Sequence, residues 1–282
     1  MRLRSWERFS PRSVDAFLRM LGAALVACVA TDAALGVWRV EAGELFPWRH
    51  VPGIPLYGDA GLVVEWALTG TAGLALLAGI RRALAVRVGL VGTLLALTQR
   101  YSNHRALLLI VLLFVAIAPP NVDAENFASE PRPNIALVRA QLLLVYASSA
   151  IGKIAHGFWT GAALTSLFGW GTFARIAAPA VIATEIAAPV MLLLRPRAGL
   201  ALVVVLHTAM AVLLPSVLPF SLTMVAMSLL FVPTRPEERR GADGLADARQ
   251  PPPDRASAVA AASLASPRGG SQRLGNAGAL RS

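Results

Sequence analysis

Lysine, cysteine and charge are all scarce in this chain. Its 282 residues include one lysine, Lys153, and one cysteine, Cys28, so arginine supplies every other permanently cationic side chain. A single cysteine excludes an intrachain disulfide and any metal site built from several cysteines. Because Cys28 lies in an apolar run, we interpret it as a small packing residue. Charged residues make up 15% of the chain, against about a quarter in soluble domains. This composition argues against a soluble globular protein.

Long apolar runs are abundant in the chain. Hydrophobic residues make up 56% of the chain, and runs of transmembrane length recur from residue 15 to residue 232. We therefore predict an all-α fold: a polytopic membrane helical bundle in a lipid bilayer, with about eight transmembrane helices. The predicted spans are 15–36, 61–80, 83–98, 105–118, 135–154, 173–194, 198–214 and 218–232.

Three segments outside the spans have their own character. Residues 1–14 are basic and no small-residue cleavage site follows the first apolar run, so we predict a cytoplasmic N-terminus and a retained first helix. Residues 155–172 are rich in glycine and aromatic side chains, which favours a position at or dipping into the membrane interface. Residues 233–282 contain almost no large apolar side chains and are predicted to form a disordered cytoplasmic tail.

The net charge of +10 would suggest nucleic acid as a partner of a soluble protein, but the arginines form no continuous basic patch. They lie at span ends and in both tails, so a charge bias across the membrane explains them better. Inner loops richer in arginine predict a multi-pass protein of the cell membrane with both termini in the cytoplasm. In that topology His104, Lys153 and His156 all fall at the outer ends of their spans.

One stretch, Arg139–Gly161, reads RAQLLLVYASSAIGKIAHGFWTG and carries a polar stripe. Residues seven apart return to nearly one face of a helix, so Arg139, Tyr146 and Lys153 share a face. A lysine in a poorly solvated site can lose its proton, whereas an arginine cannot. Lys153 is thus a candidate proton acceptor within a membrane segment. The alternative interpretation is a lysine that reaches for the interface and anchors a helix end.

Other polar residues in the membrane part have two interpretations each. His104 is a candidate functional histidine or part of a helix-capping segment with Ser102. His207, in the middle of an apolar span, needs a hydrogen-bond partner or a cavity and is either functional or a satisfied structural residue. Glu185 lies between two prolines and must be protonated or paired, with His207, Arg139 and Arg175 as candidate partners. No two histidines are spaced for one helix face, so no metal is predicted.

These residues also resemble a known family. Arg139, Gln141, Val145, Tyr146, Lys153, Trp159 and Gly161 match in order the lysine-bearing helix of vitamin K-dependent γ-glutamyl carboxylase, whose bacterial relatives form the HTTM (horizontally transferred transmembrane) family. The segment SNHRALLLI is similar to the family's Asn-His segment at His104. A later segment is similar to its histidine helix and includes His207, Phe220 and Ser221. The resemblance covers about residues 15–232.

The resemblance implies a carboxylase-like membrane enzyme with a reduced quinone, of menaquinol or vitamin K hydroquinone type, as co-substrate. It makes Lys153 the base that deprotonates the hydroquinone and gives His104 a hydrogen-bonding role toward an oxyanion or the quinone. Tyr146, His207 and Glu185 are then candidate cofactor-binding residues. The family's large domain after the helices is replaced here by the polar tail. This difference favours a second hypothesis, a non-catalytic accessory protein for maturation of a secreted peptide or protein. A transporter is less favoured because the chain has no inverted repeat.

Overall fold

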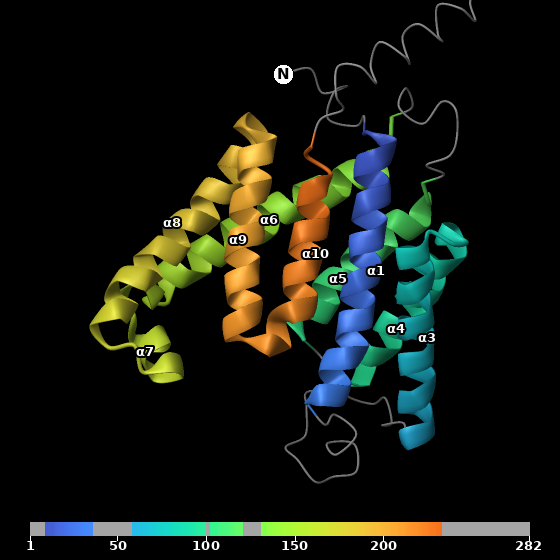
Figure 1. The fold of residues 1–282 in the computed structure, drawn as a ribbon, viewed down its shortest axis with the longest axis horizontal. Coiled ribbons are helices and arrows are strands. Elements are labelled where there is room, and N and C mark those ends of the chain that lie inside the picture. The colour runs from blue at the N-terminus through green and yellow to red at the C-terminus, as the bar shows by residue number, and fades with distance from the viewer. Residues whose placement is uncertain (1–8, 36–57, 100–101, 121–130, 233–282) are drawn as a thin grey trace, which may run out of the picture. The chain divides into compact units, whose positions relative to one another are not determined.

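The computed structural model describes residues 9–35, 58–99, 102–120 and 131–232 (Figure 1). In these ranges the chain forms α-helices and two short 3₁₀ helices, with no strand. Residues 1–8, 36–57, 100–101 and 121–130, together with the predicted tail at 233–282, lie outside the described residues. The elements are α1 (Pro11–Ala34), α3 (Asp59–Ala78), α4 (Arg82–Gln99), α5 (Asn103–Ile117), α6 (Pro133–Ala155), η2 (Phe158–Thr160), α7 (Ala162–Phe168), α8 (Thr172–Leu194), α9 (Pro196–Leu213), η3 (Pro215–Val217) and α10 (Leu218–Leu229).

The helices confirm the predicted fold class. Within the described ranges, six helices are long and apolar enough to cross a membrane, namely α1, α3, α4, α6, α8 and α9. Two further apolar helical segments, Asn103–Ile117 and Pro215–Leu229, are shorter. Each predicted span corresponds to one of these helices. The protein is a multi-pass, all-α membrane protein.

Helix α1 begins earlier than the sequence predicted. Residues 1–14 were expected to be a polar terminus, but the helix starts at Pro11. Proline suits the first turn of a helix because its missing N–H has no helical acceptor there and its fixed φ matches the helix. The other helix boundaries lie closer to the predicted ones.

Small residues allow α1 and α3 to pack closely. A Cβ atom added to Gly22 would lie 2.6 Å from the carbonyl oxygen of Gly73, and one added to Gly73 would lie 2.8 Å from the carbonyl oxygen of Gly22. Both distances are too short for a side chain, so the two backbones are in direct contact. Close approach at small residues is a common way for helices to associate in a membrane. Cys28 is buried in the same apolar core, which confirms its interpretation as a packing residue.

Two arginines connect helices that are distant in the sequence. Arg105, in the first turn of α5, forms a buried ion pair with Asp32 near the end of α1. Arg139 on α6 donates from Nε to the carbonyl oxygen of Leu230 at 2.9 Å and lies over the ring of Phe9 at 4.2 Å. These contacts hold α5 against α1, and α6 against the end of α10.

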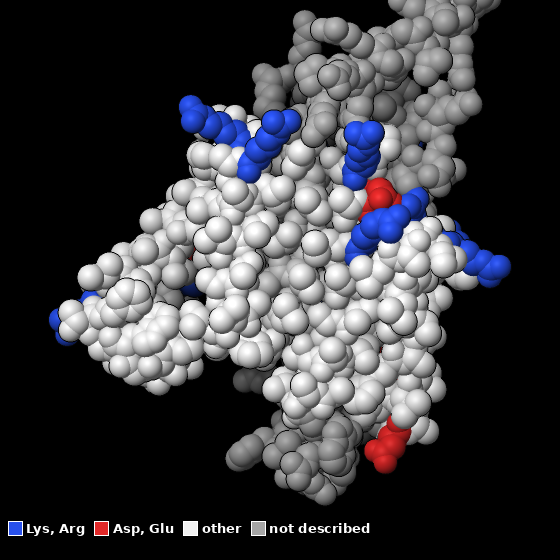
Figure 2. Space-filling view, viewed as in Figure 1, with Lys and Arg blue, Asp and Glu red and all other residues white. Residues whose placement is uncertain are grey.

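Basic side chains gather at one end of the described bundle. Figure 2 shows them over the start of α1 and the α8–α9 junction, above a face with few charged side chains. The α3–α4 junction is at the same end, because Arg82 pairs with Asp15 and Arg19 donates to the carbonyl oxygen of Leu77 at 2.7 Å. Leucine, isoleucine and valine side chains are exposed on α6, α8 and α9, as expected for helices that contact lipid.

Candidate functional site

Helix α6 directs polar side chains toward α8 and α9. Tyr146, Ser149 and Lys153 are spaced by three and four residues, so they lie along one side of the helix. Tyr146 is almost fully buried at 2% exposure, whereas the Lys153 side chain is 25% exposed. The polar stripe predicted from the sequence therefore runs from the buried part of α6 to a partly open end.

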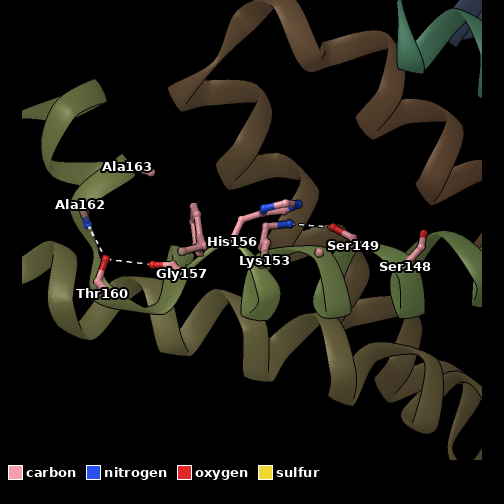
Figure 3. A pocket seen from close by; sticks show the side chains of 10 residues that line it. Ser148, Ser149, Lys153, His156, Gly157, Thr160, Ala162 and Ala163 are labelled. Carbon is pink, nitrogen blue, oxygen red and sulfur yellow. Dashed lines mark hydrogen bonds between the residues drawn. The ribbon is translucent and has the colours of Figure 1, made fainter.

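Lys153 is held by two side chains. Its Nζ donates to Oε1 of Glu185 on α8 at 2.6 Å and to Oγ of Ser149 at 2.7 Å. Ser149 in turn donates to the Glu185 carboxylate, with Oγ 3.2 Å from both oxygens. Figure 3 shows the Lys153 side chain extended back along α6 toward Ser149. The amine, the hydroxyl and the carboxyl group thus form one closed set of hydrogen bonds.

The position of Glu185 follows from the sequence of α8. Glu185 is 4% exposed, in a helix that contains Pro179 and Pro189. Pro189 has no N–H, so it cannot form the helical bond that the Glu185 carbonyl would otherwise accept from position 189. A carboxyl group buried in this way requires a partner. Lys153, 32 positions earlier in the chain, supplies that partner.

A pocket of about 700 Å³ opens beside Lys153. Residues of α6, η2 and the start of α7 line it: Ser148, Ser149, Gly152, Lys153, His156, Gly157, Phe158, Thr160, Ala162 and Ala163. The Lys153 Nζ lies 5.8 Å from the centre of the Phe158 ring. Glu185, which holds the Lys153 amine, is not among the residues that line the pocket.

Gly161 allows the tight turn in the segment that lines this pocket. Gly161, with φ of 78°, joins η2 to α7, and a Cβ there would lie 2.6 Å from the backbone carbonyl of Ala174 on α8. Only glycine fits this left-handed turn at such close approach. Leu164 of α7 then packs against Ala174 and Ala178. The glycine-rich stretch at 155–172 therefore contains two short helical turns that line the pocket and pack on α8.

A second polar pair lies deeper between α6 and α9. The hydroxyl of Tyr146 and Nε2 of His207 are 3.0 Å apart, and His207 is 2% exposed. The other ring nitrogen, Nδ1, is buried and has no hydrogen-bond partner among the described residues. His207 therefore has the partner that its mid-span position required.

His104, at the start of α5, is not among the residues that line the pocket beside Lys153. His104 is 3.2 Å from the hydroxyl of Ser102, which also accepts a bond from the Arg105 amide. Ser102 therefore caps the start of α5, and His104 belongs to the capping segment, as one of its two interpretations predicted.

The partner of Glu185 differs from the three candidates named from the sequence. His207 bonds Tyr146, and Arg139 bonds the Leu230 carbonyl. The candidate Arg175, on α8 itself, is likewise not the residue that holds the Glu185 carboxylate. The role of Ser149 was also missed, although its position four residues before Lys153 is the spacing at which helical side chains meet.

No protein-family model, curated protein or solved structure matches this chain. In the described ranges, no group of three His, Cys, Asp or Glu side chains is placed to hold a metal ion. What the site offers is an amine, two serine hydroxyls, an imidazole and an aromatic ring around an open pocket. Such a set can hydrogen-bond a small polar head group and exchange one proton with it.

Proposed function

We propose that this protein is a membrane-embedded enzyme in which Lys153 accepts a proton from a lipid-soluble hydroxyl compound, of which a reduced quinone is the favoured case. The observation that carries the proposal is that Lys153 lines an open pocket while hydrogen bonds to Glu185 and Ser149 hold its amine in place. A proton acceptor must be within hydrogen-bond reach of its substrate and held in place. The proposal agrees with the resemblance to the HTTM family and to the membrane domain of vitamin K-dependent γ-glutamyl carboxylase.

The pocket fits a hydroquinone head group in size and chemistry. Its volume of about 700 Å³ falls in the usual range for small-molecule sites, about 300–1,000 Å³. Phe158 supplies an aromatic face, and Lys153, Ser148 and Ser149 supply groups that hydrogen-bond ring oxygens. Exposed apolar residues on α6, such as Ile151 and Ile154, line the route by which an isoprenoid tail would lie in lipid.

Each residue has a distinct task in this proposal. The reduced quinone, when oxidised by dioxygen, supplies the driving force for removing a proton from a substrate carbon, as the family resemblance implies. Lys153 takes the hydroxyl proton, and Ser149 orients the lysine amine. Tyr146 and His207 hold each other and fix the face of α6 below the pocket. The geometry lends no support to a contact between His104 and the same ligand, and His156 is the histidine beside Lys153 in the lining.

The proposal places the protein in the cell membrane with both termini in the cytoplasm. Support comes from the arginines at the α3–α4 and α8–α9 junctions, because basic loops favour the cytoplasmic side. The pocket at the end of α6 then faces the outer leaflet. Cysteines introduced singly at Arg197 and Thr160 test this orientation. The Thr160 variant should react with an impermeant thiol reagent in intact cells, and the Arg197 variant should react only after lysis.

A second candidate is an accessory protein that assists maturation of a secreted peptide or protein. The observation that favours it is the ion pair, which satisfies both Lys153 and the buried Glu185 without any chemistry. In that case Lys153 serves only to stabilise the fold. A protein partner would co-purify with the chain, and exchange of Lys153 would alter stability but not lipid content.

Mass spectrometry of co-purified lipids separates the two candidates. Wild-type protein and Lys153→Ala are purified in the same detergent, and lipid-soluble molecules are extracted from each. The enzyme proposal expects a quinone enriched in the wild type and depleted in Lys153→Ala, with Ser102→Ala as a control at a residue that does not line the pocket. Equal quinone content in a folded wild type and a folded Lys153→Ala would contradict it.

A further inference from the structure

We infer that Glu185 determines the charge of the ligand that the Lys153 pocket accepts: a neutral protic head group rather than an anion. This inference rests on the proposed function, since it concerns the same pocket. It assigns to Glu185 a positioning and specificity role, because the residue acts on the ligand through Lys153 and does not line the pocket itself.

The argument begins with the count of charges at the site. Among the described residues that line the pocket, Lys153 carries the only fixed charge. Glu185, whose Oε1 is 2.6 Å from the Lys153 Nζ, carries the opposite charge. The pair has no net charge either as ammonium and carboxylate or as amine and carboxylic acid. The pocket therefore presents a neutral polar centre with one transferable proton.

Because Glu185 is buried, a net charge at this site costs free energy. The Glu185 side chain is 6% exposed, and the helices around it are apolar. An uncompensated charge in such surroundings is costly, because little solvent is present to stabilise it. A bound anion would give the site a net negative charge. A neutral hydroxyl compound leaves the site without net charge when it binds. If Lys153 has first passed a proton to Glu185, the site also stays neutral after the ligand proton moves to the lysine amine.

The proton balance of that sequence is complete. In the resting pair, an ammonium proton of Lys153 moves along the 2.6 Å hydrogen bond to the Glu185 carboxylate, giving an amine and a carboxylic acid. The amine then takes the proton of the ligand hydroxyl, whose O–H electron pair remains on oxygen. The products are an ammonium, a carboxylic acid and a ligand anion, which sum to zero charge. No oxidant or other reactant is needed for this step.

If Glu185 acts through its charge, removing the carboxylate should reverse the preference of the pocket for neutral over anionic head groups. In Glu185→Gln the side chain keeps its shape and its place beside Ser149, but Lys153 becomes an unpaired ammonium at the wall of the pocket. A cation without a counter-charge attracts anions, and more strongly where little solvent screens it. The variant is therefore expected to bind an anionic head group more tightly than a neutral one. This preference should not depend on the length of the apolar tail of the ligand.

The test uses two probes that share a ring and a dodecyl tail: para-dodecylphenol, whose head group is neutral near pH 7, and para-dodecylbenzoate, whose head group is an anion there. Equilibrium binding of each radiolabelled probe is measured with the full-length protein in one detergent. We expect wild type to prefer the phenol, and Glu185→Gln to shift the ratio of the two affinities toward benzoate by about tenfold or more. Glu185→Asp, which keeps the charge, should stay close to wild type. The same comparison in a His156→Ala background removes the other titratable side chain of the lining.

The outcomes separate the two levels of the proposal. If wild type binds the phenol but Glu185→Gln leaves the affinity ratio unchanged, the role of Glu185 is wrong and the proposed function stands. If wild type binds neither probe, or if Lys153→Ala binds the phenol as well as wild type does, the proposed function fails and this inference with it. Glu185→Ala creates the same unpaired ammonium and gives the same test if Glu185→Gln does not fold. A merely structural role for Glu185 would weaken both probes equally.

Discussion

Lys153 on α6 and Glu185 on α8 meet at 2.6 Å, although 32 positions separate them in the chain. Lys153 is the only lysine among 282 residues, and Glu185 is one of the few acidic residues buried in the described bundle. Their contact joins the polar stripe of α6 to the proline-containing helix α8. It also supplies the one primary side-chain amine of the protein at the wall of an open pocket.

The coupling between these two residues can be measured by a double-mutant cycle. Lys153→Met and Glu185→Leu each remove one partner and leave the other without its ion pair, so each should lower thermal stability in detergent. Because the Lys153 side chain is 25% exposed, we expect a coupling energy of only about 1–2 kcal/mol. The double variant should be more stable than the sum of the single losses predicts. Strict additivity would show that the pair does not interact in solution.

The Tyr146–His207 pair should contribute to stability without involving the pocket. Tyr146→Phe removes the hydroxyl and leaves Nε2 of a buried imidazole without its partner. The expected loss is about 1–3 kcal/mol in the free energy of unfolding, measured by denaturant titration of the purified protein. The companion variant His207→Phe in the Tyr146→Phe background should recover part of that loss, because it removes the unpaired group. Full stability of Tyr146→Phe alone would contradict the buried hydrogen bond.

Close packing of α1 on α3 makes Gly73 intolerant of a side chain. Gly73→Ala brings its Cβ to 2.8 Å from the Gly22 carbonyl oxygen, so the helices must separate. Overpacking of this kind costs about 1–3 kcal/mol, and thermal unfolding should report it. Gly70→Ala is the matched control, one turn earlier on α3, because its Cβ would meet only Val29 at 3.9 Å. Equal melting temperatures for the two variants would contradict the packing.

The buried ion pair of Arg105 and Asp32 should contribute more to the stability of the fold than an exposed ion pair does. Arg105→Met leaves the Asp32 carboxylate buried without this partner, and we expect a loss of about 3–5 kcal/mol. Arg19→Met removes an arginine whose side chain is 46% exposed and which pairs with Asp15, so its loss should be below about 1 kcal/mol. Both variants are compared by thermal unfolding in the same detergent. A larger effect at Arg19 would overturn this ranking.

Much of the fold could be predicted from the sequence because it depends on local properties. Within the described ranges, apolar runs predicted the six helices long enough to cross a membrane and the two shorter apolar ones, and the spacing of Tyr146 and Lys153 placed them on one side of α6. Helix boundaries were less certain where proline begins a helix: α1 starts at Pro11, because proline is favourable in the first turn and does not interrupt the helix.

The partners of polar residues were harder to predict because they depend on which helices pack together. Glu185 was expected to be protonated or paired, but its partner Lys153 comes from α6, and α6–α8 packing cannot be predicted from periodicity. His104 shared a predicted membrane level with Lys153, yet depth alone does not bring two helix ends together laterally. Ser149 was within reach of prediction, since its spacing from Lys153 is the helical i, i+4 contact.

Hydroquinone oxidation in proteoliposomes tests the central claim most directly. Dioxygen uptake is recorded with a short-chain hydroquinone for wild type, Lys153→Arg, Lys153→Ala and protein-free liposomes. If Lys153 is the base, wild type accelerates uptake over the protein-free rate, and both variants lose about 100-fold or more of that acceleration. Wild-type rates in folded Lys153→Arg and Lys153→Ala would contradict the account, as would a wild type no faster than empty liposomes.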